Sequence, residues 1–97
     1  MSEHIGGGKI GMVSSSWPFG KLSIKYDGIT LNIGIRDAHL TREDIKSISF
    51  KRGLINKRFI FIHENKKIKK VVEFWTFSPD PVLADFRAAG YSMNEDE

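Results

Sequence analysis

The chain has 97 residues, of which 15 are Lys or Arg and 12 are Asp or Glu, so its formal net charge is +3. This length fits one domain, and a composition with 40% hydrophobic and 28% charged residues is that of a globular protein rather than a disordered one. Cysteine is absent, which excludes a disulfide scaffold, a cysteine-ligated zinc site and a thiol nucleophile. No apolar run approaches the ~20 residues of a membrane-spanning helix, and the first residues lack the pattern of a signal peptide. We therefore expect a cytoplasmic single domain.

The charge is unevenly distributed along the chain. Residues 1–50 carry six basic and five acidic side chains, residues 51–78 carry eight and two, and residues 79–97 carry one and five. A basic middle segment is thus followed by an acidic end. Such asymmetry indicates either a partner-binding face or lysines that fill solvent-exposed loops and strand faces.

The first twenty residues contain many small residues and few periodic apolar ones. We predict that residues 1–8 are flexible, that 9–13 form a short edge strand, and that 17–20 form a turn. An exposed edge at 9–13 could pair with a second copy of the chain, which would give a homodimer by sheet extension.

The next segment has the alternation of a half-buried hairpin. Leu22, Ile24 and Tyr26 alternate with polar residues, and the alternation resumes from Ile29 to Ile35. The Asp-Gly pair at 27–28 predicts a two-residue turn in which both residues have positive φ.

The rest of the predicted sheet follows in short steps. We expect a polar connection over 36–42, strands over 46–51, 59–62 and 70–77, a loop over 53–56 and a turn over 64–67. Each predicted strand follows its predecessor after a short polar connection. The pattern therefore indicates an antiparallel meander of five or six strands.

The hydrophobic period changes after residue 77. Ser78 is suited to the N-cap of a helix, Pro79 to its first position, and Gly90 to its end in the left-handed conformation. The apolar stripe of this helix consists of Val82, Leu83, Phe86 and Ala89. We expect Tyr91 to fold back onto Phe86, and residues 92–97 to form a disordered acidic tail.

The predicted fold class is mainly β with one C-terminal α-helix, an antiparallel meander bent into a half-barrel or barrel that the helix caps. The stretches 40–48 (LTREDIKSI) and 74–91, in which an apolar strand leads into the helix, resemble the pleckstrin-homology-like (PH-like) barrels, including their GRAM-like and bacterial branches. The resemblance spans residues 20–91 and implies a single PH-like domain over 9–91 that binds or scaffolds. The basic phosphoinositide motif of many PH domains is not carried over, because no cation follows Lys21 and Lys25 in the first hairpin until Arg36.

No motif in the sequence indicates catalysis. Residues 6–11 fit the pattern G-x-G-x-x-G, but no strand precedes them and no helix follows them, as a dinucleotide site requires. His4, His39 and His63 are far apart and lack the spacing of metal ligands on one element. We therefore predict a non-enzymatic protein without a metal or a cofactor.

Basic residues around two predicted loops are the strongest candidates for function. They frame apolar Leu54 and Ile55, which either reach a membrane interface or tuck under the barrel rim. The candidate contact residues are Lys51, Arg52, Leu54, Ile55, Lys57, Arg58, Lys66, Lys67, Lys69 and Lys70. The two loops adjoin opposite ends of one strand, so a single contiguous patch is left open.

Three kinds of partner fit these residues. We rank a protein partner or a second copy first, an anionic membrane surface second and nucleic acid third. Nucleic acid would need aromatic rings on an exposed strand face. The rings in the basic segment, which a hydrophobic core also needs, are Phe59, Phe61, Phe74, Trp75 and Phe77.

Overall fold

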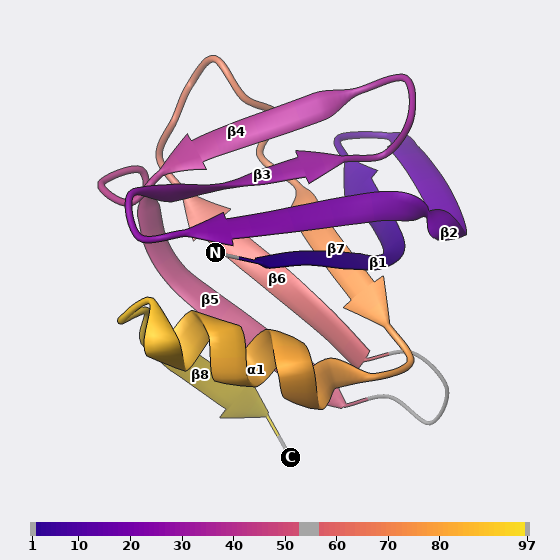
Figure 1. The fold of residues 1–97 in the computed structure, drawn as a ribbon. Coiled ribbons are helices and arrows are strands. Elements are labelled where there is room, and N and C mark those ends of the chain that lie inside the picture. Colours follow the sequence, from indigo (N-terminus) through magenta and orange to yellow (C-terminus); the bar gives the residue numbers. More distant parts are fainter. Residues whose placement is uncertain (1, 53–56, 97) are drawn as a thin grey trace.

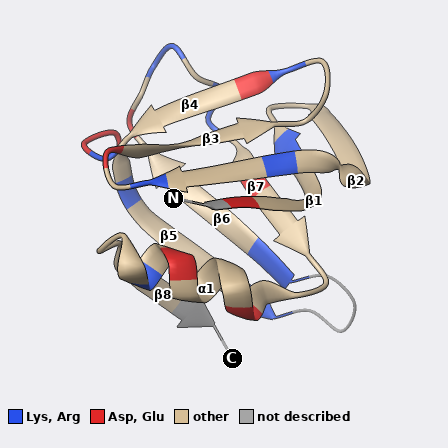
Figure 2. Ribbon diagram, in the orientation of Figure 1, with Lys and Arg blue, Asp and Glu red and all other residues tan. Residues whose placement is uncertain are grey.

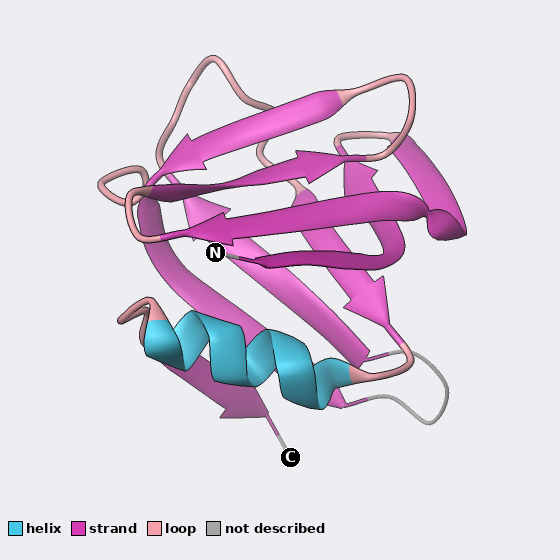
Figure 3. Ribbon diagram, viewed as in Figure 1, coloured by secondary structure: helices cyan, strands magenta, loops and turns pink. Residues whose placement is uncertain are grey.

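The computed structural model describes residues 2–52 and 57–96, which form one curled sheet and one helix (Figures 1 and 3). The strands are β1 (Ser2–Ile10), β2 (Val13–Lys25), β3 (Gly28–Asn32), β4 (Asp37–Thr41), β5 (Ile45–Arg52), β6 (Lys57–His63), β7 (Val72–Thr76) and β8 (Met93–Asp96). The helix α1 (Pro79–Ala88) lies between β7 and β8 in the chain. The predicted fold class, mainly β with one C-terminal helix in a half-barrel, is confirmed.

The sheet has the strand order β4-β3-β2-β1-β7-β6-β5-β8. Strands β1 to β4 form one antiparallel meander, and β5 to β7 form another. The two meanders join where β1 pairs with β7, with Gly7 opposite Trp75 and Ile10 opposite Val72. Because a strongly twisted sheet curls, its inner face can enclose a core.

Apolar side chains at alternate positions of the strands point to the inner face of the sheet and form the core. Phe50, Phe59, Phe61 and Phe74 point inward and are at most 1% exposed. The Phe59 ring centroid lies 4.7 Å from that of Phe50 and 5.6 Å from that of Phe86 on α1. These rings form a core rather than an exposed stacking face.

The helix begins at the predicted Pro79 and buries three of the four residues of the predicted stripe, whereas Ala89 is its partly buried C-cap. Val82, Leu83 and Phe86 belong to the core, and Gly90 adopts the left-handed conformation with φ of 85°. Tyr91 packs edge-on against Phe86 with a centroid separation of 5.7 Å, as expected. Ser78 occupies the N-cap position, but its side chain makes no capping hydrogen bond.

The N-terminal segment differs from the prediction. The expectation of flexibility is wrong for residues 2–8, because residues 2–10 form β1 in the interior of the sheet, and residue 1 lies outside the described residues. The predicted edge strand at 9–13 is also wrong, because Lys9 pairs with Ser14 on one side and with Glu73 on the other. The expected homodimer required an exposed strand edge at residues 9–13, and because that edge is already paired, the reason to expect the dimer is gone. A run of glycines has no side-chain alternation that could reveal a strand, and this is why the pattern missed β1.

Two further strands depart from the prediction. The expected turn at 17–20 lies inside β2, which continues through a cis peptide bond between Trp17 and Pro18. The expected polar connection at 36–42 contains β4, in which Ala38 and Leu40 are buried between exposed polar neighbours. The hairpin after β2 is confirmed, but neither Asp27 nor Gly28 has a positive φ.

The end of the chain is also ordered differently. The expectation of a disordered tail is wrong for residues 93–96, because Met93–Asp96 forms β8, which pairs with β5 in parallel, and residue 97 lies outside the described residues. With β1, β4 and β8, the described residues contain eight strands instead of five or six. The domain therefore extends beyond the predicted limits of 9–91.

Candidate functional site

Four of the predicted basic residues come together at one end of the sheet. Lys51 and Arg52 end β5, Lys57 and Arg58 begin β6, and the register pairs Lys51 with Arg58 and Arg52 with Lys57 (Figure 2). An antiparallel pair places such opposite residues about 5 Å apart on one face of the sheet, and successive residues point to opposite faces. Lys51 and Arg58 therefore share the outer face, Arg52 and Lys57 share the inner face, and the two pairs meet only at the end of β5 and β6. Leu54 and Ile55 lie outside the described residues.

The second basic group is separate. Lys66, Lys67, Lys69 and Lys70 belong to the connection between β6 and β7, at the other end of β6. The seven residues of β6 span roughly 20 Å, so the two groups do not form one patch. Lys66 and Lys70 instead line a shallow depression with His63, Asn65 and Ile68.

An exposed pair of aromatic rings lies at the same end as the first basic group. Lys57 pairs with Thr76, so Phe77 follows at the end of β7 beside the start of β6. The ring of Phe77 lies 6.4 Å from that of Trp17, and the two residues are 55% and 53% exposed. We call the surface formed by Trp17, Phe77, Lys51, Arg52, Lys57 and Arg58 the aromatic–basic end.

A bulge in β2 explains why Trp17 faces solvent. Gly6 pairs with Gly20 whereas Gly8 pairs with Ser15, so the four residues 16–19 lie opposite the single residue Gly7, three more than in a regular ladder. Bulges redirect side chains out of the regular alternation. Phe19, in the same bulge, is 68% exposed. The sequence pattern indicates Trp17 as a turn anchor and Phe77 as the end of a strand, and no local signal indicates that they meet.

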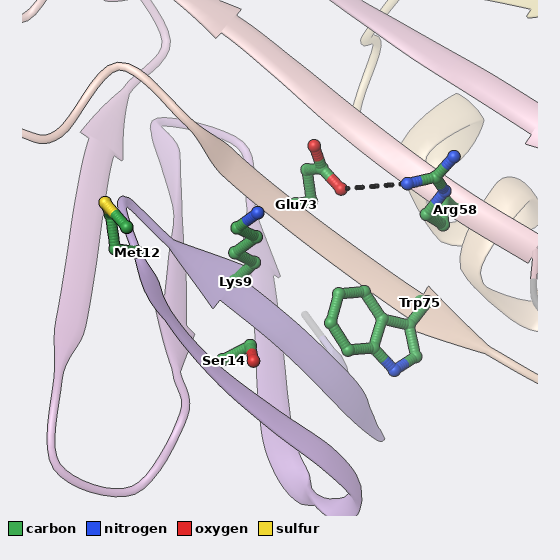
Figure 4. A pocket seen from close by; sticks show the side chains of 6 residues that line it. All are labelled: Lys9, Met12, Ser14, Arg58, Glu73 and Trp75. Atoms are coloured by element: carbon green, nitrogen blue, oxygen red, sulfur yellow. Dashed lines mark hydrogen bonds and ion pairs between the residues drawn. The ribbon is translucent and has the colours of Figure 1, made fainter.

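A depression of about 450 Å³ lies on the outer face of β1, β6 and β7, next to this end (Figure 4). Its lining residues are Lys9, Met12, Ser14, Arg58, Glu73 and Trp75. Arg58 Nη1 lies 3.4 Å from Glu73 Oε1, and this ion pair fixes one side of the depression. The Trp75 indole lies against β1, where a Cβ added at Gly7 would come 2.2 Å from its Nε1.

The glycine run has a structural role in this arrangement. Residues 6–8 lie within β1, and the strand β2 follows, whereas a pyrophosphate site needs a helix at that point. A Cβ at Gly6 would come 2.2 Å from the carbonyl oxygen of Trp75. The glycines therefore allow β1 to pack closely under β7.

The histidines lie apart and each contacts another part of the fold. Nε2 of His4 lies 2.9 Å from Asp85 Oδ2, Nδ1 of His39 lies 2.9 Å from the Thr30 hydroxyl, and Nε2 of His63 lies 2.9 Å from the Lys69 carbonyl oxygen. Within residues 2–52 and 57–96, no group of three or more His, Asp or Glu side chains could hold a metal ion.

Two titratable groups have shifted pKa values, and both serve the fold. The Asn65 side chain and the Thr41 backbone N–H donate to the Asp44 carboxylate and lower its pKa. Burial raises the pKa of Tyr91, and the nearby positive charge of Arg42 opposes that shift. Neither group belongs to the aromatic–basic end.

None of the described helices is long and apolar enough to cross a membrane. No protein-family model matches the chain, and no curated protein matches its sequence. Candidate functions must therefore be argued from the surface itself.

Proposed function

We propose that this chain is a non-enzymatic, cytoplasmic binding module with a PH-like barrel, and that its aromatic–basic end binds a protein partner. The PH-like assignment is supported by a four-strand and a three-strand meander in one curled sheet with a C-terminal helix on the core. The binding function rests on one observation, the exposed ring pair of Trp17 and Phe77 beside four cations.

Exposed aromatic rings beside arginines are typical of protein interfaces. Tyr, Trp and Arg are enriched among the residues that contribute most to binding, and a polar, solvent-accessible rim surrounds them. Phe77 and Trp17 offer apolar area to a partner, while the positive charge of the basic residues at this end favours carboxylates on the partner. The partner face that fits is apolar at its centre and acidic at one side.

The test uses a photo-crosslinking residue placed at Phe77, with the same residue at Ile62 as a control. Ile62 is 49% exposed and lies near the end of β6 that is opposite Lys57. A partner protein should crosslink from position 77 and not from position 62. Once purified, it should bind Trp17→Ser at least roughly tenfold more weakly than wild type. Equal binding of wild type and Trp17→Ser would refute the proposal that the aromatic–basic end binds the partner.

The same end also favours a second candidate, an anionic membrane surface. Tryptophan and phenylalanine insert at the headgroup level, and each nearby Lys or Arg adds electrostatic attraction to anionic lipid. Co-sedimentation with anionic liposomes at about 50 and 300 mM salt tests it, because screening weakens such attraction. Salt-sensitive binding that is lost in Lys51→Glu/Arg52→Glu/Lys57→Glu/Arg58→Glu would favour the membrane, and absence of binding at low salt would leave the protein partner.

A further inference from the structure

Strand β8 differs from its neighbours in direction and in charge. It pairs with β5 in parallel, with Met93 opposite Ile48 and Asp96 opposite Lys51, whereas the other described pairings are antiparallel. It is also the last strand in the sheet order, so β5 is the only strand to which it is hydrogen-bonded among the described residues.

The register of β8 sets Glu95 opposite Phe50 and Asp96 opposite Lys51. Because the two strands run in the same direction, the sequence Asn-Glu-Asp over 94–96 advances toward the end of β5, where Lys51 and Arg52 lie. An antiparallel strand would carry the same residues away from them. The direction of β8 and its charge are therefore complementary to the β5 edge.

Contacts of Tyr91 anchor the chain to the rest of the fold immediately before β8 begins. The Tyr91 hydroxyl donates to the carbonyl oxygen of Lys25 at 2.9 Å, and its ring packs on Phe86. Beyond it, Ser92 is exposed and Met93 is half-buried against the core. With four residues and one neighbouring strand, β8 is shorter than the usual strand of five or six residues, so it can leave while the helix stays anchored.

If β8 dissociated, the exposed edge of β5 could pair with another strand. The backbone groups of β5 that face away from β6 would lose their partners, and such a row pairs readily with an extended segment. A groove of about 200 Å³ continues along this edge, lined in part by Ile45, Lys46 and Ser47. Residues 90–92 also line this groove, so it continues the β5 edge past the N-terminal end of β8.

We propose that the β5 edge is a binding site for an extended acidic segment of a partner protein, and that β8 occupies it as an internal competitor. The segment binds in parallel, with an apolar residue at the place of Met93 and carboxylates two and three residues later, opposite Phe50 and Lys51. The proposal goes beyond the proposed function, because it uses the backbone of β5 and not the rings of Trp17 and Phe77, although Lys51 and Arg52 belong to both surfaces.

The test compares the full-length wild type with Glu95→Lys/Asp96→Lys, using an acetylated peptide of the sequence of residues 92–97 as the probe. The charge reversal should release β8, so amide exchange in the outward-facing half of β5 should accelerate at least tenfold. The variant should also bind the acidic peptide at least tenfold more tightly than wild type. A peptide with lysines in place of its three acidic residues should not bind.

Two control variants distinguish the β5 edge from general charge attraction and from the aromatic–basic end. Glu3→Lys/Asp37→Lys changes the net charge equally at exposed positions of β1 and β4, and should bind the peptide as wild type does. Trp17→Ser/Phe77→Ser should leave peptide binding to the released edge unchanged. In wild type, excess peptide should shift the NMR signals of residues 93–96 toward those of a free tail.

The proposal would be overturned if the released variant failed to bind the acidic peptide, or bound the lysine peptide equally well. Unchanged signals of residues 93–96 in wild type at saturating peptide would also contradict it. This last measurement needs no substitution, so it decides the matter even where the charge-reversed variant folds poorly.

Discussion

Replacing Arg42 should destabilise the fold more than any other single change to an exposed or half-exposed cation. Its Nη1 donates to the carbonyl oxygens of Tyr26 at 2.6 Å and Ala89 at 2.9 Å, and its Nη2 donates to that of Gly90 at 2.7 Å. Its guanidinium carbon also lies 4.5 Å from the ring centroids of both Tyr26 and Tyr91. One side chain thus joins the β2–β3 turn to the end of α1.

The size of the effect follows from these contacts. A hydrogen bond to a charged group contributes about 1.5–3 kcal/mol when enclosed, and roughly half of that is reasonable for a half-buried side chain. Carbonyl groups at a helix C-terminus lack partners within the helix and favour a positive charge nearby. With a ring contact adding about 0.5–1 kcal/mol, Arg42→Ala should cost about 3 kcal/mol of unfolding free energy and lower the melting temperature by roughly 15 °C.

Urea denaturation followed by circular dichroism measures the loss. Arg36→Ala is the matched control, because Arg36 is exposed in the connection between β3 and β4, and it should stay within about 0.5 kcal/mol of wild type. Arg42→Lys should fall between the two, since a single ammonium group cannot reach three carbonyls and stack on both rings. A loss in Arg42→Ala no larger than that in Arg36→Ala would refute the reasoning.

Three other substitutions test separate parts of the fold. Gly7→Ala should cost about 1–3 kcal/mol, measured by urea denaturation, and change the fluorescence of Trp75, because the new Cβ would overlap the indole. The pKa of Asp44 lies below its ordinary value of 3.8. The difference in unfolding free energy between wild type and Asp44→Ala should therefore be constant above about pH 5 and shrink as the pH falls below 3.8. The pKa of Tyr91 lies above its ordinary value of 10.0, so the stability of wild type relative to Tyr91→Phe should fall as the pH rises above 10.0 in denaturation measured across that range.

Sequence periodicity predicted the parts of the fold in which side chains report burial. Leu22, Ile24, Phe59 and Phe61 alternate with other residues along their strands, and the stripe around Phe86 repeats at helical spacing, so both kinds of element could be placed. Periodicity failed for strands whose side chains do not alternate clearly between apolar and polar. The glycines of β1 have no alternation, β4 is too short and polar to stand out, and β8 is held by a neighbouring strand rather than by its own pattern.

The candidate site was predicted only in part, for a related reason. The cations at 51–52 and 57–58 flank one loop, so their meeting follows from a local hairpin. The approach of Trp17 to Phe77 depends on the bulge opposite Gly7 and on the pairing of β1 with β7. Contacts between segments so far apart in the chain leave no local signal in the sequence.

The position of β1 also governs the order in which this protein can fold during synthesis. β1 is made first, but its second neighbour, β7, is among the last strands to leave the ribosome. Until residues 72–75 emerge, the outer edge of β1 has no partner within the chain. Contacts that span most of a chain slow folding, and unpaired strand edges expose a nascent chain to aggregation. The meander β1–β4 therefore completes its pairing only after β7 has been made.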